Sequence, residues 1–101
     1  MESCFEDCTS LTKAPAIPAN VTDMRWCFSG CTALKGVQLL CNYDGTGDEF
    51  VEVFKNCTSL EEGGIKVKNE QYGDYTAAAA LDNMKVPGDD EAAKKAKFST
   101  F

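Results

Sequence analysis

One arrangement of apolar and polar positions occurs three times along this 101-residue chain. It is an octet in which a small apolar residue is followed by Phe, two variable residues, Cys, Thr, another variable residue and Leu. The copies occupy residues 4–11, 27–34 and 53–60. Self-similarity at a period of roughly 20–50 residues is typical of repeat proteins, in which each copy is one structural unit stacked on the next. The pattern therefore predicts a short solenoid.

Apolar residues continue at every third position behind the first two octets. They are Leu11, Ala14 and Ile17 in the first copy and Leu34, Val37 and Leu40 in the second. Pro15 and Pro18 disfavour a helix here, because proline lacks an N–H donor and clashes with the preceding turn. We therefore predict one short strand in each repeat, paired in parallel with the strand of the next. Phe-x-x-Cys is then a compact turn whose Phe and Cys side chains point inward.

The last third of the chain has no octet. Residues 74–84 are rich in alanine, the best helix former, and Asp74 is a plausible N-cap, so a helix is predicted there. Residues 89–98 begin with acids and end with lysines, as the helix dipole favours, and predict a second short helix. The apolar contacts of these helices would come from Leu81, Met84 and Phe98. Because something must cover the last repeat of a solenoid, we expect residues 68–101 to be a C-terminal helical cap.

Together these patterns predict an α/β repeat fold. Residues 1–67 form about two and a half repeats with stacked short parallel strands, and residues 68–101 form the cap. The phenylalanines of the octets form an internal ladder, together with the cysteines at their fifth position. The ladder consists of Phe5, Phe28, Phe54, Cys8, Cys31 and Cys57.

The six cysteines allow more than one interpretation. The first octet position holds Cys4, Cys27 and Val53. Valine replaces a buried apolar thiol but cannot replace a metal ligand or a disulfide partner, and free cysteine is usually buried. This favours reduced, structural thiols. Disulfides within a column of stacked repeats remain an alternative, as does a thiol- or metal-dependent site. The residues available for that site are Cys4, Cys8, Cys27, Cys31 and Cys41.

Composition narrows the classes of partner and of chemistry. The chain has 16 acidic and 10 basic side chains, and its charge of −6 disfavours nucleic acid and anionic lipid as partners. No apolar run is long enough to insert into a membrane, and no signal peptide is visible. The absence of histidine removes Ser–His and Cys–His nucleophile pairs. The sequence therefore predicts a protein that is not an enzyme and that uses no cofactor.

Candidate binding residues are those that we expect to face outward. Trp26 aligns with Ser3 and Glu52, so its side chain is predicted to be exposed, and aromatic residues are enriched at interface hot spots. Packing of Trp26 against a neighbouring loop is the other interpretation. Tyr43 is the second candidate, in an insertion that begins at Cys41 and is expected to bulge outward as a loop. The remaining candidates lie between apolar strand positions: Lys13, Lys35 and Gln38.

Residues 4–24, which read Cys-Phe-x-x-Cys-Thr-Ser-Leu-Thr-x-Ala-Pro-x-Ile-Pro-x-x-Val-Thr-x-Met, resemble the BspA-like leucine-rich repeats of bacterial surface proteins. The resemblance extends over about residues 1–67. It implies a right-handed solenoid of the leucine-rich-repeat type, exposure at the cell surface or secretion, and a role in cell adhesion or protein binding. The family pattern contains no catalytic residues.

The function expected from these observations is non-catalytic binding of a protein or another extracellular macromolecule. A thiol- or metal-dependent module and a purely structural spacer are the alternatives. Nothing before Cys4 in the sequence would cover the first repeat, and an uncovered strand edge pairs readily with another chain. We therefore expect that the chain either self-associates through its N-terminal end or is the tail of a longer solenoid.

Overall fold

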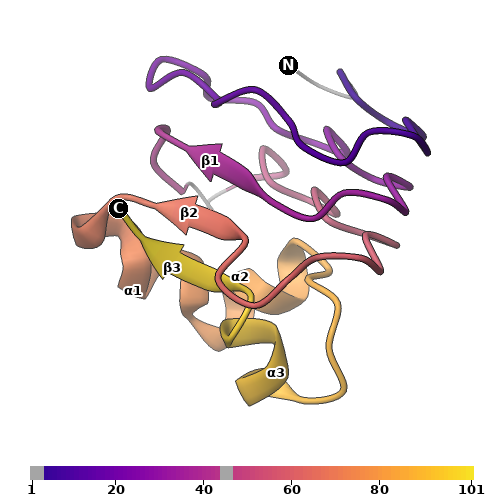
Figure 1. The fold of residues 1–101 in the computed structure, drawn as a ribbon. Helices are drawn as coiled ribbons and strands as arrows, with labels where there is room; N and C mark the ends of the chain where they lie inside the picture. Colours follow the sequence, from indigo (N-terminus) through magenta and orange to yellow (C-terminus); the bar gives the residue numbers. More distant parts are fainter. Residues whose placement is uncertain (1–3, 44–46) are drawn as a thin grey trace.

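The computed structural model describes residues 4–43 and 47–101, and within them it shows a small α/β fold. Three short strands form one open parallel sheet in the order β1-β2-β3: β1 (Val37–Leu39), β2 (Ile65–Val67) and β3 (Phe98–Thr100). The segment before β1 extends this arrangement, because bridges join Lys13 to Gly36 and Ile17 to Leu39, both in parallel. Figure 1 shows the chain advancing from the indigo first turns at one end of the molecule to β3 and α3 at the other.

The helices of the described residues follow β2 in the sequence, and all of them are short. They are the 3-10 helix η1 (Asn69–Gln71) and the α-helices α1 (Tyr72–Thr76), α2 (Ala78–Asn83) and α3 (Glu91–Lys95). In Figure 1, α1 and α2 lie against the side of the sheet near β2 and β3. They contribute Tyr75, Ala80 and Leu81 to the buried core.

Each octet forms the same tight turn. The backbone N–H of its Cys donates to the carbonyl of its Phe, at N–O distances of 3.1 Å in the first copy, 3.0 Å in the second and 3.1 Å in the third. The residue before the Cys has a positive φ in every copy: 59° at Asp7, 80° at Gly30 and 64° at Asn56. Glycine, asparagine and aspartate adopt this left-handed conformation most readily. The predicted Phe-x-x-Cys turn is therefore present three times.

The three octets stack in register. The Phe5 and Phe28 rings are parallel with centroids 5.4 Å apart, and the Phe28 and Phe54 rings follow at 5.9 Å. Phe28 and Phe54 are fully buried, whereas Phe5 is half-buried at the open end of the stack. The cysteines of the fifth octet position follow the same trend, since Cys31 and Cys57 are buried and Cys8 is half-buried.

The strand positions differ from the predicted three-residue spacing. Val37 and Leu39 of β1 are buried, while Gln38 and Leu40 are only half-buried. The bridge from Ile17 reaches Leu39, so Leu39 and not Leu40 takes the inward position. The reason is that side chains of a strand alternate between its two faces with a period of two.

The helix predicted over residues 74–84 is divided in two. Ala77 has φ −59° and ψ 145°, which is extended backbone between α1 and α2. Asp74 lies within α1 and is not its N-cap, and Thr76 instead donates its hydroxyl to the Tyr72 carbonyl at 2.7 Å. At 100° per residue, a continuous helix would place Tyr75 and Leu81 about 120° apart. The break allows both side chains to be buried.

The helix predicted over residues 89–98 is shorter than expected and is followed by a strand. Asp90 caps α3 by accepting a hydrogen bond from the Ala93 N–H at 2.8 Å, and the helix ends at Lys95. Phe98 then begins β3, where it is 5 % exposed and its ring stacks on Tyr75 with centroids 6.2 Å apart. This segment pairs in parallel with the edge of β2, so residues 68–101 are not purely helical.

Candidate functional site

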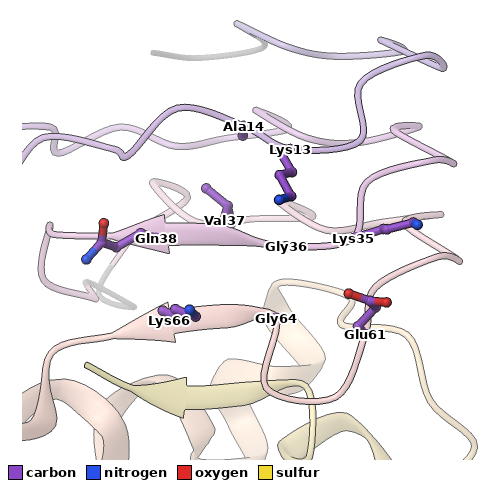
Figure 2. Close-up of a pocket in the computed structure, with 9 residues that line it drawn as sticks. All are labelled: Lys13, Ala14, Lys35, Gly36, Val37, Gln38, Glu61, Gly64 and Lys66. Carbon is purple, nitrogen blue, oxygen red and sulfur yellow. The ribbon is translucent and has the colours of Figure 1, made fainter.

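The exposed face of the sheet carries an open hollow of about 340 Å³. Three of the residues expected to face outward, Lys13, Lys35 and Gln38, line it. The other lining residues are Ala14, Gly36, Val37, Glu61, Gly64 and Lys66. Figure 2 shows Lys35 and Glu61 toward one end of the hollow and Gln38 toward the other, with Lys13 above Gly36.

Two glycines on neighbouring segments form the floor of the hollow. A Cβ at Gly36 would lie 2.5 Å from the Gly64 carbonyl oxygen, and a Cβ at Gly64 would collide with the Lys35 carbonyl oxygen. The two backbones therefore approach more closely than any residue with a side chain would allow. Because no side chain rises from either glycine, the backbone lies open between the surrounding lysines.

The hollow is locally positive although the whole chain carries a charge of −6. Lys13, Lys35 and Lys66 are exposed, and Glu61 is the single acidic residue in its lining. No ion pair within the described residues neutralises these three lysines. Charges separated by more than about 8 Å are largely screened at physiological ionic strength. A ligand in the hollow therefore meets three lysines and one carboxylate, Glu61, and the local charge is positive.

A polar row continues from the hollow across the sheet. Gln38 is in register with Lys66, and Lys66 is in register with Ser99. Gln38 and Lys66 are less buried than the residues on either side of them, and Ser99 is less buried than Phe98. The Ser99 hydroxyl donates to the Gly63 carbonyl at 2.7 Å. The row gives the exposed face both cationic and hydrogen-bonding groups.

Trp26 is not the freely exposed side chain that the alignment predicts. It is half-buried, and its indole N–H donates to the Glu52 carboxylate of the next turn, with Nε1 and Oε1 3.2 Å apart. Its backbone has a positive φ of 55°, as does that of Glu52 at 53°. The contact ties two successive turns together, so the alternative of packing against a neighbouring segment describes Trp26 better.

Tyr43 also takes part in packing. Its ring lies 5.1 Å from Phe50 and 5.5 Å from Tyr75, measured between centroids, and the ring is half-buried. The Tyr43 hydroxyl accepts a hydrogen bond from Asn83 at 3.1 Å, and the Tyr43 N–H donates to Gln71. The start of the insertion is thus held against α1 and α2, while residues 44–46 lie outside the described part of the chain.

Cys41 is part of the core and not of an outward loop. Its side chain is fully buried, and the Tyr75 hydroxyl donates to its carbonyl at 2.8 Å. The Cys41 sulfur lies 3.6 Å from the same hydroxyl. Burial raises the pKa of both groups, so each stays protonated at neutral pH.

The six cysteines are free thiols. Burial raises the pKa of Cys27 and of Cys57 to about 12, far from the values of reactive thiolates. Cys4 is the exposed member of the set. Within residues 4–43 and 47–101, no three Cys, Asp or Glu side chains gather closely enough to hold a metal ion.

Sequence reasoning did not identify the other six lining residues of the hollow as site residues: Ala14, Gly36, Val37, Glu61, Gly64 and Lys66. A signal for two of them is present, because a glycine within a predicted strand often marks a close backbone approach. The positions of Glu61 and Lys66 depend on the register between β1 and β2, which the sequence pattern did not give beyond the second octet.

Comparisons of the chain with protein-family models, with curated proteins and with solved structures gave no match. Among the described residues, no helix has the length and apolar character needed to cross a membrane.

Proposed function

We propose that the chain is a non-catalytic protein-binding or adhesion module of a bacterial surface protein. In this proposal it is a short right-handed solenoid of the leucine-rich-repeat type, similar to BspA-like repeats. Residues 1–67 are the repeats, residues 68–101 are the C-terminal cap, and the protein acts at the cell surface or after secretion. The partner is a protein or another extracellular macromolecule.

The stacking of the octets supports the repeat architecture. The three phenylalanine rings lie one above the next, and the turns that carry them have the same hydrogen bonds. Leu81, Met84 and Phe98, all from the C-terminal third, are buried in the same core as the octets. This is the arrangement expected when a terminal segment covers the last of several stacked repeats.

The lysine-lined hollow is the observation that carries the binding proposal. Lys13, Lys35 and Lys66 surround an open backbone floor on a sheet face that none of the helices in the described part of the chain covers. Carboxylates are the groups that such lysines bind best in a protein partner, through charge-assisted hydrogen bonds. The partner is therefore an acidic, extended segment of another protein, laid across the sheet face with carboxylates over the hollow.

A binding assay tests this directly. The probe is a fluorescent dodecapeptide of alternating Glu and Ser, compared with one of alternating Gln and Ser, and anisotropy reports binding at low and at high salt. The triple variant K13Q/K35Q/K66Q should bind the acidic peptide about tenfold more weakly, which corresponds to ~1.4 kcal/mol. Raising the salt concentration should weaken binding by the unaltered protein.

The matched control removes three exposed lysines outside the hollow. K55Q/K85Q/K95Q changes the net charge by the same amount and should leave the affinity nearly unchanged. Equal losses in the two triple variants would show that only net charge matters and would refute the site. Failure of the unaltered protein to distinguish the acidic peptide from the neutral one would favour the structural-spacer alternative.

A further inference from the structure

The hydrogen bonds between successive turns have a single polarity. On the turn side of the stack, backbone N–H groups of an earlier octet donate to carbonyls of the later one. The bonds are Phe5 to Cys27 at 2.8 Å, Asp7 to Ser29 at 2.7 Å, Phe28 to Val53 at 3.1 Å and Gly30 to Lys55 at 2.8 Å. Along this side of the described chain, no backbone N–H of a later octet donates back to an earlier one.

This polarity determines what the first turn presents at the open end. Cys4 and Glu6 correspond to Cys27 and Ser29, whose carbonyls accept the hydrogen bonds from the preceding octet. No backbone N–H of the described residues donates to the Cys4 or Glu6 carbonyl. The open edge of the first turn therefore exposes carbonyl acceptors, whereas the Phe5 and Asp7 N–H groups already donate to the second octet.

The thiol hydrogen bonds have the opposite polarity, because a cysteine of a later octet donates to a backbone carbonyl of the earlier one. Cys31 Sγ donates to the Phe5 carbonyl at 2.9 Å, and Cys57 Sγ donates to the Phe28 carbonyl at 3.0 Å. Cys8 occupies the same octet position, but no acceptor for its thiol is found among the described residues. The open end thus combines two carbonyl acceptors with one thiol donor.

Apolar surface surrounds these polar groups. Phe5 has a ring neighbour on one side only, whereas Phe28 is stacked on both sides. Phe5, Leu11 and Ala14 are half-buried, although the residues that follow them in the stack are covered by a further turn. A partner that matches this end must bring an apolar ring, two N–H donors and a carbonyl acceptor together.

We propose that the first turn is a docking edge for one more turn of the octet type, stacked on Phe5 as Phe5 is stacked on Phe28. Such a turn directs the N–H groups of its Phe and of its fourth residue at the Cys4 and Glu6 carbonyls. Its Phe carbonyl accepts the Cys8 thiol, and its ring stacks on Phe5. Each of these contacts repeats one already present between the first and second octets.

The same polarity disfavours a symmetric dimer through this edge. A two-fold axis brings identical surfaces together, so the Cys4 and Glu6 carbonyls of one copy would face carbonyls of the other. Buried carbonyls without donors cost free energy of the order of a lost hydrogen bond each. Head-to-head self-association through the N-terminal end is therefore disfavoured.

A fusion tests the proposal in the full chain. A copy of residues 4–26 is joined directly to Cys4, because residue 26 naturally precedes the octet that begins at Cys27. The copy carries C4V and C8A, so that labelling by a thiol reagent reports the host cysteines alone. We expect Cys8 of the host to be labelled at least tenfold more slowly than in the parent, and the denaturant midpoint to rise.

The control fusion differs by a single residue. Its copy also carries D7P, which removes one N–H donor and cannot adopt the positive φ of this turn. It should label at Cys8 as fast as the parent and unfold at the parent's midpoint. Three results would overturn the proposal: unchanged Cys8 labelling in the first fusion, equal protection in both fusions, or a concentration-dependent dimer of the parent abolished by substitutions at this edge.

Discussion

Val53 fills the octet position that Cys4 and Cys27 occupy in the other copies, and Cys27 and Val53 are both fully buried. We expect Cys27→Val to change the free energy of unfolding by less than ~1 kcal/mol, because the site accepts valine in an equivalent turn. Cys31→Val should cost about 0.5–1.5 kcal/mol more, since its thiol donates to the Phe5 carbonyl. Urea unfolding compares the two variants. Equal losses of unfolding free energy in the two variants would contradict this distinction. In a separate measurement, stoichiometric zinc in the purified protein would support the metal alternative.

The buried thiols also predict how stability depends on pH. Cys27 and Cys57 have their pKa raised by burial from 9.0 to about 12. The folded state therefore holds these protons more tightly than the unfolded state, and the stabilisation is complete below pH 9. It is lost as the pH rises from 9 toward 12, by up to about 1.4 kcal/mol per pH unit for each thiol. Denaturant midpoints measured from pH 7 to 11 should stay level and then fall; a midpoint that is constant through pH 11 would contradict the burial.

The three octets pack on one another through a stack of phenylalanine rings. Phe28 is fully buried between two other rings, whereas Phe5 is half-buried with one ring neighbour. Phe28→Ala should cost roughly 3–5 kcal/mol, and Phe5→Ala should cost clearly less. Thermal or urea unfolding measures both. Small and equal effects would show that the rings do not stabilise one another as a stack.

At the scale of the whole molecule, the octets and the C-terminal third share one core. Phe98 of β3 contacts Tyr75 of α1, and β3 completes the sheet beside β2. Phe98→Ala should therefore destabilise both halves together by roughly 3–5 kcal/mol. Fluorescence of Trp26, the single tryptophan, reports on the octets, and far-UV circular dichroism reports mainly on the helices.

The two signals should give coincident unfolding curves in the parent and in the Phe98 variant, as a single cooperative unit requires. The expected result is one shared midpoint, shifted equally in both signals. An unfolding curve from circular dichroism that precedes the tryptophan curve would instead mean that residues 68–101 form a separate unit.

The sequence by itself determined the turns. Phe, Cys, Thr and Leu recur at fixed spacing, and the conformation they adopt depends on neighbours within a few residues, including the positive φ at Asp7, Gly30 and Asn56. Local patterns of this kind can be recognised in the sequence without any knowledge of distant contacts.

Only the tertiary structure decided the rest, because it depends on contacts between residues far apart in the sequence. Phe98 reads as the end of a helix, yet the open edge of β2 takes it into a strand. The 74–84 helix is broken at Ala77 so that Tyr75 and Leu81 both reach the core. The candidate site arose in the same way: Gly36 and Gly64 come together through the register of neighbouring strands, and that approach opens the hollow between the lysines.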